Sequence, residues 1–283
     1  MFTYSFIRSA VIYAVALLGI AVPATSSATH SWGGYHWART TPQFTLKIGT
    51  NLTSPDWSAH LAQISRDWNS PEMVGATFTP ILTKIVVGQA NKRCSMVAGT
   101  TQVCNGRYGN NGWLGLASIY ITGGEHITKG SAKLNDTYFD TVTYNNPNER
   151  QHVMCQEVAH TFGLDHQSTD GSSQNTCMDY FSNTGSNAGS TQSTGPNAHD
   201  FDELNTIYTH TDSTTTVAAT AALTTPALDV TDDPDNWGQL VRQSVNGRSS
   251  TYERFNRDGS KTITHVYWTI EAASKCPSCD HRY

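Results

Sequence analysis

The residues of this chain that are best suited to metal chemistry lie between positions 155 and 166. Gln156 and His160 are four positions apart, and His166 follows after a glycine. On a helix, residues four apart share one face, so Gln156 and His160 could both reach one ion. Glu157 lies beside them, where its carboxylate could take a proton from a metal-activated water. The spacing therefore predicts a metal site with Gln156, His160 and His166 as ligands and Glu157 as the general base.

The return of His166 towards the same ion depends on Gly163. Glycine adopts a positive φ at little cost, so the chain can leave a helix there and change direction. His166 then approaches the ion from a second direction. Three protein ligands and one open position for water are the pattern of catalytic zinc. We therefore expect one catalytic Zn²⁺.

This stretch resembles the extended signature His-Glu-x-x-His-x-x-Gly-x-x-His of the metzincin clan of zinc endopeptidases, with Gln156 at the first histidine position. Metzincins carry a methionine turn beneath the metal, and Met178 follows at a suitable distance. The resemblance implies that Tyr180 reaches the metal or the transition state. Residues 196–208 are similar to the helix that closes such domains. The implied fold is α+β over residues 29–211, with a mixed twisted sheet, two long helices and a loop-rich lower subdomain.

The resemblance implies a secreted zinc-dependent endopeptidase that cleaves protein or peptide substrates. The alternative is a weak or inactive pseudopeptidase that acts as a secreted binding protein, because the neutral amide oxygen of Gln156 is a poorer zinc donor than imidazole. His152 lies about 12 Å along the helix axis from His160 and should not share its ion. Asp165 could orient a ligating imidazole, and His199 is a looser candidate ligand. The histidines outside any motif receive no role: His126, His210, His265 and His281.

The amino terminus reads as a signal peptide over residues 1–28, because Arg8 precedes an apolar run at 10–22 and small residues follow. That run is shorter than the roughly 20 residues of a membrane span. Only 14% of the residues are charged and the net charge is −5, which does not suggest nucleic-acid binding. We expect a secreted monomer without a membrane partner after signal cleavage.

Six cysteines in a secreted chain indicate disulfides, although about fifteen connectivities exist. Proximity suggests Cys94 with Cys104, and the C-x-x-C pair near the end suggests a short-loop disulfide between Cys276 and Cys279. The metzincin-like site suggests the remaining bridge, between the helix and the methionine turn, from Cys155 to Cys177. Two sequons mark expected glycosylation sites, at Asn51 and Asn135.

Local signals predict the remaining organisation. The sequence Ser54-Pro55-Asp56 is typical of a helix start. Strands are expected at 44–48, 78–87, 113–121 and 138–144, a loop at 88–112 and the metal-binding helix at 149–162. Strand 113–121 is either a cleft rim that pairs with substrate or an internal strand. Residues 212–235 are Thr, Ala and Pro rich like a linker. Residues 236–283 contain Asn-Gly and Asp-Gly turns, which predict a small β-rich accessory module.

Overall fold

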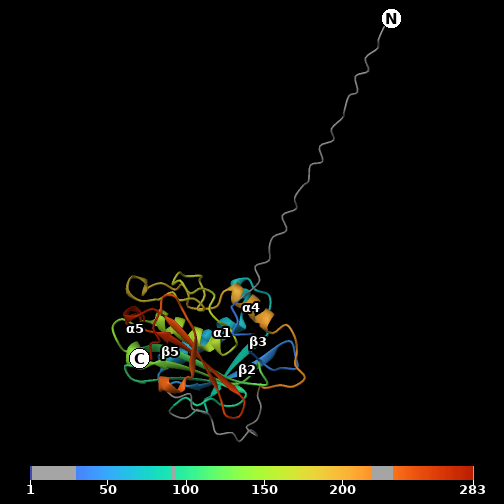
Figure 1. The fold of residues 1–283 in the computed structure, drawn as a ribbon, viewed down its shortest axis with the longest axis horizontal. Coiled ribbons are helices and arrows are strands. Elements are labelled where there is room, and N and C mark those ends of the chain that lie inside the picture. The colour runs from blue at the N-terminus through green and yellow to red at the C-terminus, as the bar shows by residue number, and fades with distance from the viewer. Residues whose placement is uncertain (2–29, 91–92, 218–231, 283) are drawn as a thin grey trace.

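A computed structural model describes Met1 and residues 30–90, 93–217 and 232–282 of the chain (Figure 1). The expected signal peptide at 1–28 and most of the expected linker lie outside the described residues. The described part combines helices with one mixed sheet. The α+β class with a mixed sheet is therefore confirmed. No helix in the described part is long and apolar enough to cross a membrane.

A nine-stranded sheet forms the centre of the structure, in the order β3-β2-β4-β6-β5-β9-β8-β7, with β1 also paired to β6. Its strands are β1 His36–Trp37, β2 Phe44–Asn51, β3 Ile81–Val87, β4 Thr100–Gly106, β5 Trp113–Thr122, β6 His126–Asn135, β7 Gln239–Gln243, β8 Ser249–Phe255 and β9 Lys261–Trp268. The pairs among β1, β2, β3, β4 and β6 are parallel, whereas β5 is antiparallel to β6 and β9. Strand β5 is thus an internal strand, and its main-chain groups are paired on both sides.

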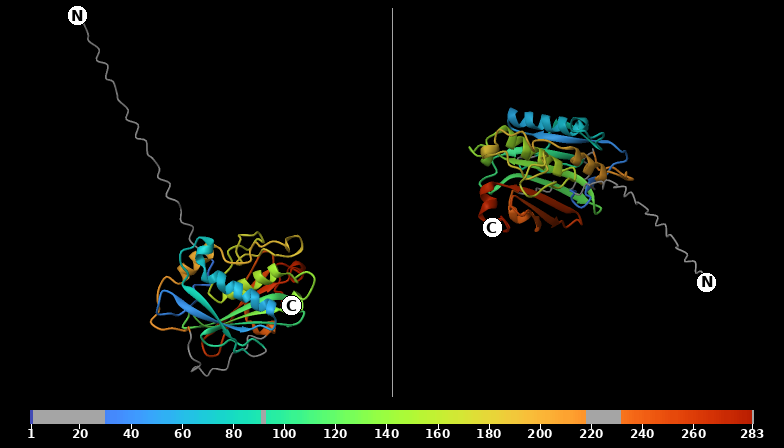
Figure 2. Two further views of the ribbon diagram at one scale, coloured as in Figure 1. Left: turned by 180° about the vertical axis from the view of Figure 1, so that it is seen from behind. Right: turned by 90° about the horizontal axis from the view of Figure 1, so that it is seen from above.

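Five α-helices accompany the sheet in the described residues: α1 Pro55–Asn69, α2 Asp136–Phe139, α3 Pro147–His160, α4 Ala198–Ile207 and α5 Ile270–Lys275. Short 3₁₀ turns occur at Pro71–Val74, Gly185–Asn187 and Pro234–Asn236. The expected start of α1 is confirmed, because the Ser54 side chain accepts the Trp57 N–H and Pro55 is the first helical residue. Helices α1 and α3 pack against each other over the sheet (Figure 2). Their shared core holds α3 against β5 and β6, which fixes where its side chains point.

Two local predictions were wrong. The expected strand at 138–144 is α2 followed by turns, because the Asn135 side chain caps a helix by accepting the Thr137 N–H. The expected loop at 88–112 contains strand β4. The segment that follows residue 29 packs against the core, where Trp32 and Trp37 are both buried.

The carboxyl-terminal strands appear where the Asn-Gly and Asp-Gly turns predicted them. They extend the main sheet, however, since β9 pairs with β5 from Ile121–Lys261 to Trp113–Trp268. The physical reason is that β5 has a second main-chain edge and apolar side chains to cover. A second core cluster joins β5 to this region through residues that include Trp113, Trp237 and Trp268. The expected accessory module thus shares its sheet and core with the rest of the protein.

All three disulfides join the predicted partners: Cys94 with Cys104, Cys155 with Cys177, and Cys276 with Cys279. The sequon at Asn135 is not usable in the folded protein. Its side chain is fully buried and its amide donates to the Gly109 and Trp113 carbonyls. Asn51 is half-buried and donates to Gln102.

Candidate metal site

Helix α3 brings the predicted site residues into the core. The Asn146 side chain accepts the Glu149 N–H at 2.8 Å and fixes the helix start. The helix ends at His160, and Gly163 then adopts φ 101°, as its sequence position predicted. A Cβ at position 163 would collide with the Tyr35 carbonyl oxygen. Glycine is therefore required there both for the turn and for the close approach of the amino-terminal segment.

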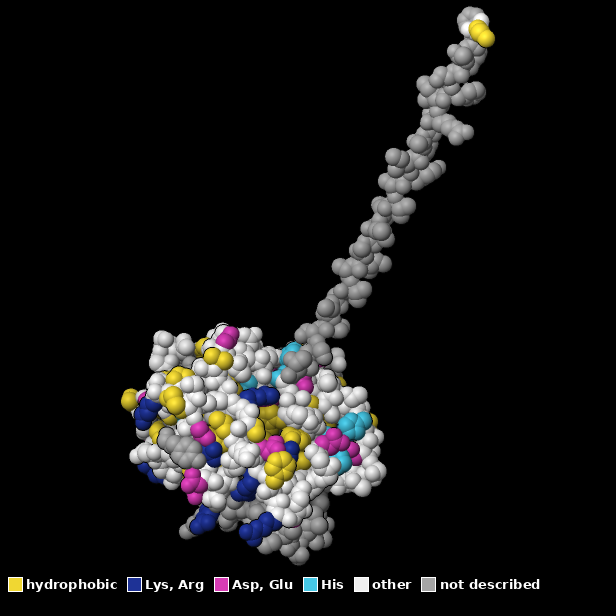
Figure 3. All heavy atoms as spheres, in the orientation of Figure 1, with side chains coloured by type: hydrophobic (Ala, Val, Ile, Leu, Met, Phe, Trp, Pro, Cys, Tyr) yellow, Lys and Arg dark blue, Asp and Glu magenta, His cyan; other side chains and the backbone are white. Residues whose placement is uncertain are grey.

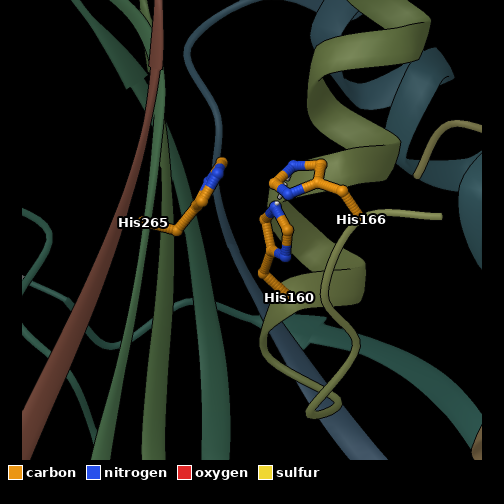
Figure 4. A group of neighbouring side chains, drawn as sticks. All are labelled: His160, His166 and His265. Atoms are coloured by element: carbon orange, nitrogen blue, oxygen red, sulfur yellow. Dashed lines mark hydrogen bonds between the residues drawn. The ribbon is translucent and has the colours of Figure 1, made fainter. Parts of the chain in front are cut away.

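The turn places two of the predicted ligands together. His160 Nε2 and His166 Nε2 lie 3.1 Å apart (Figure 4). A third imidazole joins them from strand β9, where His265 faces the pair. One ligand atom from each of the three lies within 4.8 Å of the others. We call His160, His166 and His265 the inner cluster; together they could hold a metal ion.

The other ring nitrogen of each imidazole has a partner that sets its orientation. His160 Nδ1 donates to the Leu164 carbonyl at 2.8 Å, and His265 Nε2 lies 2.6 Å from Ser249 Oγ. His166 Nδ1 lies 3.1 Å from Asp165 Oδ1 and 2.8 Å from the Tyr180 hydroxyl. Metal-binding histidines are typically held in this way by their second nitrogen. Nε2 of His160 and His166, and Nδ1 of His265, are left to face the centre.

Electrostatics also favour an ion at this position. Burial, together with the neighbouring imidazoles, lowers the pKa of His160 and His265 well below the usual value. Burial, with His30 and His152 nearby, does the same for the pKa of His166. All three rings are therefore neutral near pH 7, which is the form that binds metal.

Glu157 lies next to the inner cluster, with Oε2 at 3.5 Å from His265 Nδ1. It is fully buried, and neither carboxylate oxygen has a hydrogen-bond partner among the described residues. Burial raises the pKa of this carboxyl well above its usual value. A cation held by the imidazoles would favour the charged form. The side chain fits only because position 115 is glycine, since a Cβ there would lie 2.5 Å from Glu157 Oε1.

Gln156 faces the turn around Met178. Its amide nitrogen donates to the Cys177 carbonyl at 3.0 Å and the Asp179 carbonyl at 2.8 Å, while Oε1 has no partner in the described part of the chain. Both amide protons are thus used to join the helix to the turn, beside the Cys155–Cys177 disulfide. Whether Oε1 also binds metal stays a prediction.

The other predicted residues divide into two groups. Tyr180 and Asp165 both touch the outer nitrogen of His166, so Asp165 orients an imidazole as expected. His152 bonds to Asn183 and the Asp179 carbonyl, and His199 stacks on His30, so neither belongs to the inner cluster.

The inner cluster is closed to solvent in this structure. Glu157, His160 and His265 have no exposed surface, and His166 is buried. Trp32 stacks on His160 at 4.9 Å between ring centroids, and Arg242 forms an ion pair with Asp165. Beyond these two side chains lies a surface pocket of about 240 Å³, lined by residues that include both.

Sequence reasoning missed His265. Its neighbours in β9 are threonines and apolar residues, so it reads as an ordinary strand residue. The available signal was that a histidine stands among buried strand positions, where an ionisable side chain is uncommon without a partner.

No protein-family model matches the chain, and comparisons with curated proteins and with solved structures also find no match.

Proposed function

We propose that this protein is a secreted zinc-dependent peptidase whose metal is held by His160, His166 and His265. The observation that carries the proposal is the convergence of three oriented, neutral imidazoles beside an unpartnered carboxylate. Zinc–nitrogen bonds of about 2.0–2.1 Å put neighbouring ligands of a tetrahedral site about 3.3 Å apart. The Nε2 separation of 3.1 Å between His160 and His166 is close to that value. The three disulfides support an oxidising, extracellular location.

Each residue of the site has a separate role in the proposed reaction. When bound, zinc polarises the scissile carbonyl and lowers the pKa of its water towards about 7. Glu157 accepts the proton from that water and passes it to the leaving amine. Asp165 and Tyr180 hold His166 in place. Gln156 holds the Met178 turn against α3. His265, instead of Gln156, is the third metal ligand in this proposal. The likeness of residues 155–180 to metzincins supports peptide bonds as the substrate.

Substrate access follows from the closed geometry. Strand β5 is already paired with β9, so an extended peptide cannot add to that edge. One approach is the surface pocket that Trp32 and Arg242 line. The Arg242 side chain is 66% exposed, so it can move into solvent and open that route.

A second candidate function is favoured by the same burial. A metal site without exposed surface also suits a binding protein in which the ion only stabilises the fold. In that case Glu157 would be a buried carboxylate that compensates the charge of the ion.

The deciding experiment compares the full mature chain with Glu157→Gln. The peptidase proposal predicts about one zinc ion at the inner cluster in both proteins. It also predicts that only the wild type cleaves an unfolded protein substrate, and that a chelator stops this cleavage. Loss of a general base lowers the rate by about 10²–10⁴-fold. Glu72→Gln, at an exposed position, is the matched control and should behave as wild type. Zinc without cleavage in the wild type would overturn the peptidase in favour of the binding protein.

A further inference from the structure

A second group of histidines lies away from the inner cluster, around the carboxylate of Asp212. His126 Nε2 lies 3.2 Å from Asp212 Oδ1, His36 Nε2 lies 3.5 Å from it, and His210 Nε2 lies 3.6 Å from it. We call these four residues the outer cluster. Ligand atoms of His36, His126 and Asp212 all lie within 4.8 Å of one another. We propose that the outer cluster binds a second divalent transition-metal ion through His36, His126 and Asp212, with zinc as the best match to imidazole and carboxylate ligands.

The tautomer of His36 argues for a cation at the centre. His36 Nδ1 lies 2.8 Å from the Gly34 carbonyl and therefore carries a proton. In the neutral ring Nε2 then presents a lone pair. This atom is buried, faces a carboxylate oxygen and has no hydrogen-bond partner within the residues that the structure describes. His36 Nε2 and Asp212 Oδ1 lie 3.5 Å apart, and a metal ion between them would be a partner for both atoms.

The distances fit an ion of the size of zinc. Tetrahedral bonds of about 2.0–2.1 Å place ligand atoms about 3.3 Å apart. The three separations from Asp212 Oδ1 scatter around this value. His36 and His210 meet edge to face at 4.8 Å between ring centroids, so His210 lies directly beside these ligands. Imidazole with carboxylate is a ligand set that suits zinc and its transition-metal neighbours.

The surroundings hold the carboxylate in place. Asp212 Oδ2 accepts the Arg39 N–H at 2.9 Å, and the Asp212 N–H donates to the Arg39 carbonyl at 2.7 Å. The Arg39 guanidinium lies 3.7 Å from the same Oδ2. The positive charge of Arg39 disfavours a nearby cation. The guanidinium, however, approaches Asp212 Oδ2, whereas the histidines contact Oδ1. Burial raises the pKa of Asp212, but the Arg39 N–H, His36 and His126 lower it more, so the pKa lies below its usual value.

The outer cluster is open to solvent on one side. The His210 side chain is 55% exposed and that of His126 is 29% exposed, whereas His36 is buried. In the space-filling view of Figure 3, histidine and acidic side chains lie next to each other at one edge of the visible face. An ion can therefore enter without rearrangement of the core.

His36, His126 and Asp212 supply three ligands, and His210, whose Nε2 lies 3.6 Å from Asp212 Oδ1, is near enough to approach as a fourth and complete a structural zinc site. The ligands come from β1, from the start of β6 and from the chain just after α4. An ion here would clamp the amino-terminal segment, which also carries Trp32 over the inner cluster.

The test uses the full mature chain with His160→Ala, which removes the inner site and leaves one candidate. Cobalt is the probe, because tetrahedral Co²⁺ absorbs visible light. We expect about one Co²⁺ per chain with tetrahedral absorption, and zinc should displace this cobalt. When Asp212→Asn is added, both the bound cobalt and its absorption should be lost. Asp170→Asn, at an exposed position, is the control and should change nothing. No cobalt or zinc binding in a folded His160→Ala chain would overturn the outer site.

A second measurement applies if the His160→Ala chain does not fold. In the otherwise wild-type chain, Asp212→Asn should lower the zinc content by one ion and retain the inner one. Unchanged zinc content in that variant would also overturn the outer site. Zinc at the outer cluster alone would instead count against the proposed peptidase.

Discussion

The inner and outer clusters both contain three histidine imidazoles, but the carboxylate at each cluster is held differently. In the outer cluster Asp212 lies at the centre of the ligands, and its second oxygen is bonded to the main chain of Arg39. In the inner cluster Glu157 stands beside the imidazoles and has no hydrogen-bond partner in the described part of the chain. A carboxylate that is a ligand and is fixed on both oxygens cannot move a proton. A carboxylate that is free beside the ligands can, so the inner cluster is the one suited to catalysis.

The two clusters also differ in how deeply they are buried. The inner cluster lies within the core, where the low dielectric strengthens the effect of an ion on water and carboxylate. The outer cluster has two partly exposed histidines, where water weakens such effects. The difference suggests a reactive centre inside and a structural clamp outside.

The largest expected effect comes from His265→Phe, which keeps the ring volume and removes the ring nitrogens. The inner ion should be lost while the outer ion is kept, so the zinc content of the mature chain should fall from about two to about one, as three-ligand zinc binding requires every donor. Elemental mass spectrometry on the folded variant measures this. His281→Ala is the matched control, because His281 belongs to neither cluster. Retention of both ions would mean that Gln156 supplies the third ligand, as the sequence pattern predicts.

Gly115→Ala tests the position of Glu157 without changing a ligand. The new Cβ would lie 2.5 Å from Glu157 Oε1 and 2.6 Å from Val153 Cγ1, so the carboxylate must move. Overpacking of this kind costs about 1–3 kcal/mol of stability. If the peptidase proposal is right, kcat should fall by about 10²-fold, because displacement by about 1 Å is enough for such a loss. Both ions should remain.

Gly189→Ala is the control for that substitution, since no described atom lies within 4 Å of the Cβ that it would add. It should leave both rate and stability unchanged. Full activity in Gly115→Ala would mean that the place of Glu157 against β5 is irrelevant to turnover.

Local signals predicted most of the structure near the inner cluster. The cap at Ser54, the turn at Gly163 and the Asn-Gly and Asp-Gly hairpins depend on short-range sterics and hydrogen bonds, which the sequence displays directly. Strand β6 was missed because Lys129 and Lys133 interrupt its apolar pattern. Both lysines are nonetheless buried, with their ammonium groups over the rings of Tyr120 and Tyr108.

His265 illustrates the limit of such reasoning. Alternation along β9 indicates which side chains share a face, but the strand that β9 pairs with depends on the second edge of β5, far away in the sequence. The outer cluster was missed for the same reason, because its residues come from three separate segments. No local motif marks either arrangement.

The smallest expected effect comes from Ser249→Ala, which leaves every ligand in place. His265 Nε2 loses the hydroxyl that it contacts, so the ring is held less firmly and its tautomer is no longer fixed. Loss of such a partner lowers metal affinity by about 10–100-fold. Competition with a zinc-binding dye should show weaker inner binding and unchanged outer binding, with exposed Ser274→Ala as the control. An equal loss at both clusters would point to general destabilisation and would remove the argument that Ser249 orients His265. A loss confined to the inner cluster would mean that β8 and β9 supply both a ligand and its support, and that this carboxyl-terminal region is part of the metal site.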